Sequence, residues 1–178
     1  MVKNNNIYIF LLMILVTYNI FAKSLTPCDV YKIAEKAVVK YPYYVDDKKY
    51  FINPALIIGL VDQESSFETE ARSAAGAYGL TQIMPKTAEI LKCDYSSLNN
   101  STISVECSIK FLAALLTYNK GDLVKTLSGY NGGTYSTEKN ATDKNGVFAN
   151  RIYDNPETKK YVVKVLQKFE RYKKLDCK

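Results

Sequence analysis

The feature that constrains this chain most is an apolar helix that carries one acid to its end. Asn53-Pro54 indicates a helix start, because asparagine caps the first turn and proline fits the first helical position. Glu64 follows Leu60 by four residues and Val61 by three, so it shares their inward side. The helix is expected to end near Phe67. Its buried stripe is formed by Leu56, Ile57, Leu60 and Val61.

An acid in that position has two interpretations. Burial and the negative end of the helix dipole both raise the pKa of a carboxyl group and favour its protonated form. A general acid at neutral pH needs this condition. The alternative is a structural glutamate that pairs with a nearby lysine or arginine, or that is exposed at the helix end. Periodicity alone favours this alternative, because ion-paired acids are more common than catalytic ones.

The chain contains no histidine, and this restricts the catalytic and metal sites that it can form. It excludes Ser/His/Asp and Cys/His nucleophilic catalysis, zinc sites with histidine ligands and acid–base catalysis by histidine. Acid–base chemistry must then come from Asp, Glu, Lys, Tyr or Cys. The net charge of +6 suits an acidic polymer such as nucleic acid, an anionic membrane surface or an anionic cell wall, and it equally suits solubility alone.

Residues 1–22 have the layout of a secretory signal peptide. Lys3 precedes an apolar run over residues 7–16, and Ala22 is a small residue at the expected cleavage point. The run is short for a membrane span, and an uncleaved anchor is the alternative. We therefore expect a periplasmic or secreted protein, with no stable membrane span after cleavage and with one domain over residues 23–178.

Export changes the interpretation of the four cysteines, which all follow the predicted signal. An even number of cysteines in an oxidising compartment indicates two disulfides, although three connectivities are possible. We favour Cys93–Cys107, which closes a local loop, and Cys28–Cys177, which joins the two ends of the mature chain. A zinc site with four cysteine ligands is the alternative, and no CxxC spacing supports it.

The rest of the chain reads as helices joined by polar loops. Residues 43–51 are expected to be a charged, Tyr-rich connection, and the Gly-rich segments over 73–84 and 129–133 are expected to be loops. The segment over 134–155 has little periodicity, so it is expected either to move or to form part of a substrate cleft. Helices are predicted over residues 28–41, 53–67, 85–91, 103–120 and 123–128 and from 155 to about 169.

Four short motifs occur in order between residues 50 and 170. They are Glu64-Ser65-Ser66-Phe67, a Gly-rich motif from Ser73 to Ala88 with Gly79-Leu80-Thr81-Gln82 at its centre, Tyr130-Asn131-Gly132-Gly133, and Glu157-Thr158 followed by Tyr161-Val162. With these motifs the chain resembles the soluble-type lytic transglycosylases. That resemblance implies a mainly α fold of the α+β, lysozyme-like kind, with one helical domain and a substrate cleft.

The resemblance also implies an activity and no cofactor or metal. Such enzymes cleave the β-1,4 bond between N-acetylmuramic acid and N-acetylglucosamine in peptidoglycan and leave a 1,6-anhydromuramoyl end, without water. Glu64 would protonate the glycosidic oxygen and then take the proton from the muramoyl 6-hydroxyl. Ordinary glycosidases need two carboxylates that flank the bond. Here the motif region offers one well-placed acid, since Asp62 lies on a different side of the helix.

Further site residues follow from the motif positions. Ser73, Gln82 and Met84 would line the site, and the first two could hydrogen-bond sugar or acetamido groups. Tyr130 would lie near Glu64 and orient it or the substrate. Asn131 would contact sugar or support its loop.

The fourth motif is expected to support the site from a distance. Glu157 would be structural or a peripheral contact, and Tyr161 is expected to pack in the core because its neighbours are apolar.

Two positions depart from the family pattern. Thr81 stands where the family usually has Met, and Gly132 where it usually has Ala, and both changes are expected to alter the lining of the cleft.

The sequence leaves two other functions open. One is a muramidase that hydrolyses the same bond with water. The other is a non-catalytic wall-binding protein, against which the presence of Glu64 argues. The expected partner is the glycan strand of peptidoglycan, together with a type IV secretion or conjugation apparatus if the enzyme opens the wall locally. General wall turnover and phage entry are the other settings. No nucleic-acid partner is expected, because the signal exports the chain.

Overall fold

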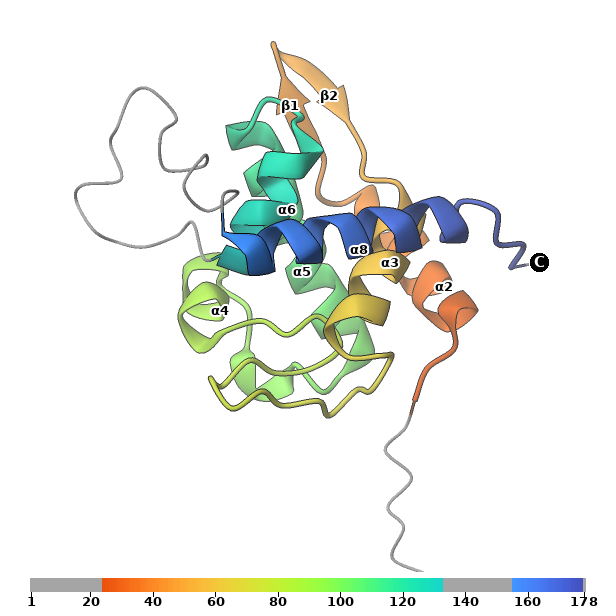
Figure 1. Cartoon of the computed structure of the whole chain (residues 1–178), viewed down its shortest axis with the longest axis vertical. Helices are drawn as coiled ribbons and strands as arrows, with labels where there is room; N and C mark the ends of the chain where they lie inside the picture. The colour runs from red at the N-terminus through yellow and green to blue at the C-terminus, as the bar shows by residue number, and fades with distance from the viewer. Residues whose placement is uncertain (1–23, 133–154, 178) are drawn as a thin grey trace, which may run out of the picture.

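A computed structural model describes residues 24–132 and 155–177 (Figure 1). The predicted signal peptide and nearly all of the segment over 134–155 therefore lie outside the described residues. Within the described ranges no helix is long and apolar enough to cross a membrane. The elements are α2 (Pro27–Val38), β1 (Tyr43–Val45), β2 (Lys48–Tyr50), α3 (Pro54–Glu64), α4 (Pro85–Leu91), the 3-10 helix η1 (Tyr95–Ser97), α5 (Ser101–Tyr118), α6 (Leu123–Gly132) and α8 (Pro156–Tyr172).

The two Asn-Pro signals mark helix starts as predicted. The side chain of Asn53 accepts a hydrogen bond from the amide of Ala55 at 2.9 Å, and Asn155 caps Glu157 in the same way at 2.8 Å. Each cap satisfies one of the amide groups that the first helical turn leaves without a partner. These caps fix where α3 and α8 begin, and α3 and α8 carry the central contact of the fold.

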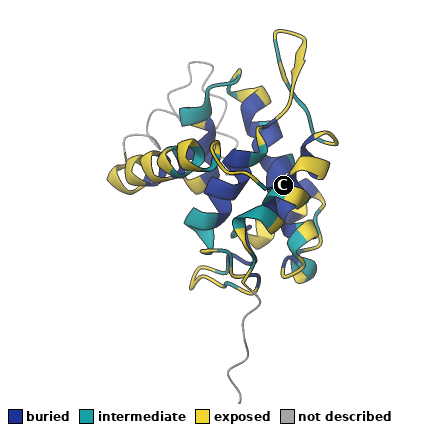
Figure 2. Ribbon diagram, turned by 90° about the vertical axis from the view of Figure 1, so that its right-hand side faces the viewer, coloured by how far each residue is buried: buried dark blue, intermediate teal, exposed yellow. Residues whose placement is uncertain are grey.

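Helix α3 is the centre of the core, and α8 lies across it (Figure 1). Every residue from Ala55 to Val61 is buried, so α3 is enclosed on all sides rather than on one stripe. At Gly59 an added Cβ would lie 2.9 Å from the backbone nitrogen of Phe169, which shows how closely the two helices approach. Around them the helices turn buried faces inward and exposed faces outward (Figure 2). Full burial of a Leu or Ile side chain contributes about 1.5–3 kcal/mol.

Both favoured disulfides are present. Cys28 in the first turn of α2 is bonded to Cys177, which follows α8, and Cys93 is bonded to Cys107 on α5. The second bridge joins residues 14 positions apart and anchors the loop after α4 to the longest helix of the described chain. A loop of that size lowers the entropy of the unfolded chain enough to contribute about 3 kcal/mol.

The connection over residues 43–51 is a correction to the sequence analysis, because it forms a β-hairpin. Tyr43 pairs with Tyr50 and Val45 with Lys48 in an antiparallel register. Asp46 and Asp47 at the turn have φ angles of 47° and 62°. Two successive residues with positive φ are typical of a two-residue hairpin turn. The strands are three residues long, too short for alternation to identify them.

The Gly-rich segment after Ser128 is a second correction, because α6 continues through Gly132 instead of ending in a loop. Tertiary packing accounts for the helix, since Tyr130 is buried with its ring centroid 5.0 Å from that of Phe111. Two predicted helices are also shorter than expected. Helix α2 ends at Val38, and α3 ends at Glu64 instead of near Phe67.

Candidate active site

Glu64 is the last residue of α3 and is only partly exposed. The hydroxyl of Tyr161, on α8, donates a hydrogen bond of 2.5 Å to Glu64 Oε1. Burial raises the pKa of Glu64 to about 7, and the Tyr161 hydrogen bond opposes this rise. At neutral pH the group therefore exists in both protonation states, which suits a residue that first donates and then accepts a proton.

The chain turns sharply just after Glu64, and this turn fixes the end of the helix. The amide and the hydroxyl of Ser65 both bond to the carbonyl of Val61, at 3.0 and 3.2 Å. Ser66 and Phe67 then have φ angles of 51° and 70°, a conformation uncommon for residues with a side chain. Phe67 packs edge-on against the ring of Tyr172. The end of α3 that carries Glu64 is thus closed by these hydrogen bonds and by the packing of Phe67.

In the part of the chain that the structure describes, Asp62, and not Glu64, is the acid of α3 that pairs with lysine and arginine. It accepts hydrogen bonds from Lys168 at 2.6 Å, Arg171 at 2.7 Å and Tyr172 at 2.7 Å. Burial alone would raise its pKa, but these donors and the charges of Lys168 and Arg171 outweigh burial and lower it. Asp62 therefore holds α8 against α3 and is occupied by its own partners, whereas no lysine or arginine of the described chain contributes to the shift at Glu64.

The segment over 73–84 is a loop, as predicted, and its polar side chains hold it together. Ser73 Oγ accepts a hydrogen bond from the amide of Ala77 at 2.9 Å. Gln82 Nε2 donates to the carbonyls of Ala71 at 3.0 Å and Gly79 at 2.9 Å. Met84 is 39% exposed just before α4. Sugar contacts by Ser73, Gln82 and Met84 stay a prediction, while the internal bonds of Ser73 and Gln82 give both a structural role.

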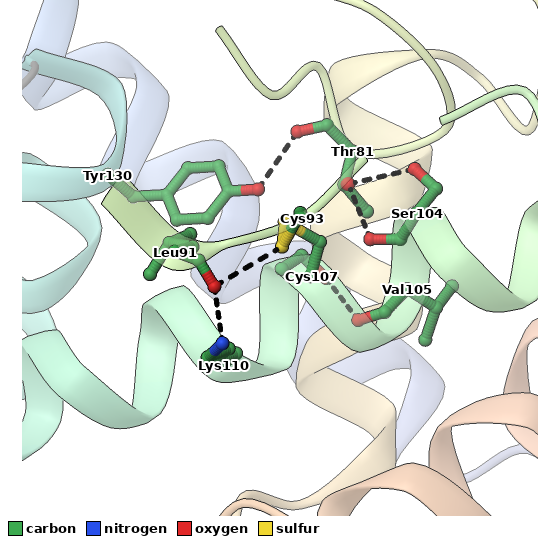
Figure 3. Close-up of a disulfide and its surroundings, with 9 residues drawn as sticks. Thr81, Leu91, Cys93, Ser104, Val105, Cys107, Lys110 and Tyr130 are labelled. Atoms are coloured by element: carbon green, nitrogen blue, oxygen red, sulfur yellow. Dashed lines mark hydrogen bonds between the residues drawn. A yellow bond between two sulfur atoms is a disulfide. The ribbon is translucent and has the colours of Figure 1, made fainter. Parts of the chain in front are cut away.

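Thr81 requires a correction, because it is fully buried and does not line a cleft. Its hydroxyl lies 3.1 Å from both the carbonyl and the hydroxyl of Ser104 on α5 (Figure 3). Its own carbonyl accepts a hydrogen bond of 2.9 Å from the hydroxyl of Tyr130. A threonine at this position is therefore satisfied inside the protein. The other departure, Gly132, lies exposed at the end of α6.

The sequence predicted that Tyr130 orients Glu64 and that Tyr161 only packs in the core. The structure shows a different arrangement of these two tyrosines. The hydroxyl of Tyr130 bonds to Thr81, although the charge of Glu64 contributes, after burial, to raising the pKa of Tyr130. Tyr161 is buried in the core as predicted, but its hydroxyl is the group that contacts Glu64. A buried tyrosine needs a partner for its hydroxyl. That need was the available signal that Tyr161 does more than pack.

Asn131 and Glu157 lie where α6 ends and α8 begins. The hydroxyl of Thr158 donates to Asn131 Oδ1 at 3.1 Å, so Asn131 joins the two helices and supports the site. Glu157 is exposed in the first turn of α8. Among the described residues no group of three Cys, Asp or Glu side chains could hold a metal ion.

The raised pKa of Glu64 predicts that the free energy of unfolding changes with pH. This prediction holds whatever reaction the protein performs. In the unfolded chain a glutamate loses its proton near pH 4.3, whereas folded Glu64 keeps it until about pH 7. The folded state thus binds more protons in this window, so the free energy of unfolding falls as pH rises through it. Glutamine at position 64 cannot titrate, so the Glu64→Gln variant should not lose this stability. At pH 8 its free energy of unfolding should therefore exceed that of the wild type by up to about 3 kcal/mol. Urea unfolding of both proteins at pH 5 and pH 8 measures the difference, and a difference that does not grow with pH would contradict the assignment.

Comparison with known proteins finds a family model, curated relatives and solved structures that match this chain. The model of the transglycosylase SLT domain matches residues 44–151, which is more than half of the chain. A membrane-bound lytic murein transglycosylase C of Actinobacillus pleuropneumoniae is 49% identical over 41 residues, 23% of this chain and 11% of that protein. A transglycosylase of Enterobacteria phage PRD1 is 35% identical over 99 residues, 54% of this chain and 35% of that protein. The chain thus spans about a tenth to a third of these relatives.

A solved structure shares the fold. The 70 kDa soluble lytic transglycosylase of Escherichia coli superposes with a TM-score of 0.60 at 19% sequence identity, over 80% of this chain and 24% of that protein. The lysozyme-like, mainly α fold expected from the sequence is confirmed by this similarity.

Proposed function

This chain belongs to the transglycosylase SLT domain family, and we propose that it cleaves peptidoglycan as a lytic transglycosylase. The bond is the β-1,4 bond between N-acetylmuramic acid and N-acetylglucosamine, and the product is a 1,6-anhydromuramoyl end. The observation that carries the proposal is the state of Glu64. It is an acid at the end of a buried helix, with a pKa raised to about 7 and a tyrosine hydroxyl on its carboxyl group.

In this mechanism Glu64 acts twice. Its protonated form donates to the glycosidic oxygen as the bond to the leaving sugar breaks. The carboxylate that results accepts the proton of the muramoyl 6-hydroxyl, whose oxygen attacks the anomeric carbon of the same sugar. Because nucleophile and target belong to one residue, their proximity replaces a positioned water molecule. Glu64 gives one proton to the leaving sugar and recovers one proton from the 6-hydroxyl, so the enzyme returns to its starting state.

The absence of a second available acid on α3 favours this mechanism over hydrolysis. A hydrolase with two carboxylates needs one as nucleophile or as the base that activates water. Asp62 is the nearest acid to Glu64 along α3, and three donors of α8 already occupy it. Glu68 and Glu70, which follow α3, are exposed. The muramidase alternative therefore has less support from the described residues.

We place this activity outside the cytoplasm. The predicted signal peptide and the two disulfides support export, because disulfides persist in oxidising compartments. Glycan strands would be the substrate there. Local opening of the wall for a type IV secretion or conjugation apparatus is one setting that fits a small exported enzyme, and a gene neighbourhood that encodes such an apparatus would support it.

Product analysis tests the proposed reaction. Purified peptidoglycan is digested with the mature protein, and the soluble fragments are separated and weighed by mass spectrometry. Fragments with anhydro ends, each lighter by one water than the corresponding reducing fragment, are the expected result. Reducing muramic acid ends without anhydro ends would identify a hydrolase instead.

The rate of cleavage should fall as pH rises through about 7, because the proton-donating form of Glu64 is then lost. The Tyr161 hydrogen bond lowers the pKa of Glu64, so Tyr161→Phe should move this alkaline fall to higher pH. Tyr172→Phe is the matched control, since that hydroxyl bonds to Asp62. The measurement is kcat/KM against pH for the three proteins. Equal alkaline limits in the wild type and Tyr161→Phe would contradict the role of Tyr161.

A further inference from the structure

A depression along α8 is lined by Lys164, Gln167, Lys168 and Arg171. Lys160 precedes Lys164 by one turn and lies on the same side of the helix. We call these five residues the α8 basic surface. It lies outside the catalytic centre, because Glu64 is not among the residues that line the depression.

The charge of the α8 basic surface is positive after its acidic neighbours are counted. Asp62 pairs with both Lys168 and Arg171, so one negative charge faces two positive ones. Lys164 and Lys160 are exposed and add two further positive charges. Glu157 is an exposed acid on the same side, one turn before Lys160. The surface therefore keeps an excess of cations, as a site for anionic groups requires.

The apolar side of α8 is already covered. Its buried residues, among them Val162 and Val165, face the core, and the helix packs on α3 and α6. The α8 basic surface is left with polar side chains, which suits a charged partner better than an apolar one. Arg171 and Lys168 are also held in place by Asp62, so part of the surface is ordered before any ligand arrives.

The α8 basic surface is close to the candidate catalytic acid along the helix. Lys168 follows Tyr161 by seven residues, which is two helical turns, so both lie on the same side of α8. Two turns correspond to about 10 Å along the axis. A polymer bound at Glu64 could therefore carry its substituents to Lys164 and Lys168.

We propose that the α8 basic surface binds the carboxylates of the peptides that are attached to the muramoyl residues of the glycan strand. This inference rests on the proposed function, since it takes peptidoglycan as the substrate. The peptide side branches carry the free carboxylates of this polymer, and an ammonium or guanidinium group pairs with them directly. The surface would select wall that still bears its peptides over bare glycan.

Binding measurements with the full mature chain test this proposal. The protein carries Glu64→Gln so that the wall is not consumed, and it is sedimented with intact peptidoglycan or with peptidoglycan stripped of its peptides by an amidase. Both materials are fixed to beads, because removal of the peptides also removes the cross-links that keep the wall insoluble. Lys164→Glu should weaken binding to the intact wall about three- to tenfold and more at low salt than at high salt, because one attraction becomes a repulsion that salt screens. Lys164→Gln should give a smaller loss. Lys32→Glu, the same charge change at an exposed position of α2, is the control.

The preference for intact over stripped wall is the deciding quantity. It should drop in Lys164→Glu and stay at the wild-type value in Lys32→Glu. An equal loss on both kinds of wall would overturn the proposal, as would loss of binding to anionic phospholipid vesicles with no change on the wall. If Lys164→Glu shows the expected loss but the active protein releases no anhydro fragments, the surface stands and the proposed reaction fails.

Discussion

Glu64→Gln should lower the rate of peptidoglycan cleavage by about a thousandfold. Proton transfer by a positioned side chain contributes about a hundred- to ten-thousandfold, and here one group performs both transfers. Glutamine has nearly the same shape but can neither donate this proton nor accept it. The release of soluble fragments from labelled peptidoglycan, measured over hours, covers the required range.

The control for this loss is Glu70→Gln, which removes an exposed acid shortly after α3. It should keep the wild-type rate. Urea unfolding of Glu64→Gln shows whether the fold is intact, and the substitution is expected to stabilise the protein above pH 7. A rate within tenfold of the wild type in a folded Glu64→Gln protein would show that another group carries the proton.

The second large effect is expected at Gly79, in the loop that faces α5. An added Cβ would lie 2.1 Å from the carbonyl oxygen of Leu98 and 3.0 Å from the hydroxyl of Ser104, and the φ angle is +80°. The first contact is with backbone, so the loop or its neighbour must move. Overpacking of this kind costs about 1–3 kcal/mol or more, and positive φ adds about 1–2 kcal/mol for a residue with a Cβ. We expect Gly79→Ala to lower the free energy of unfolding by about 2–5 kcal/mol.

Gly76→Ala separates the two causes. Gly76 has a φ of +92°, but nothing lies within 4 Å of an added Cβ. Its substitution should therefore cost only the backbone strain, about 1–2 kcal/mol. Denaturant unfolding at fixed pH measures both variants against the wild type. Equal losses at the two positions would mean that the close approach of Gly79 to Leu98 does not constrain the loop.

The parts of the fold that sequence predicted well are those with a local physical signal. The Asn-Pro pairs at positions 53 and 155 start helices because cap and proline act within one turn. The hairpin over β1 and β2 and the continuation of α6 through Gly132 depend on contacts between distant residues. The packing of the buried Tyr130 ring against Phe111 keeps the Gly-rich end of α6 helical, and no pattern in its own segment shows this.

The candidate site divides in the same way. Helical spacing placed Glu64 on the inward side of α3, and in the structure it is half-buried there, with a raised pKa that burial causes. Its partner could not be identified by spacing, because Tyr161 is 97 residues away and sits in an apolar stripe. Spacing along the chain also could not show which acid of α3 pairs with lysine or arginine, because the cations come from α8. Asp62 has its cations only because α8 crosses α3 at that point.

Cleavage in water labelled with heavy oxygen tests the central claim most directly. If Glu64 donates a proton to the glycosidic oxygen and accepts one from the muramoyl 6-hydroxyl, no water enters the product. Every new muramoyl end released by the wild-type protein should then be free of the label and lighter by one water than a reducing end, and Glu64→Gln should release almost none. New ends that carry heavy oxygen would show that water is the nucleophile and would contradict the proposed reaction.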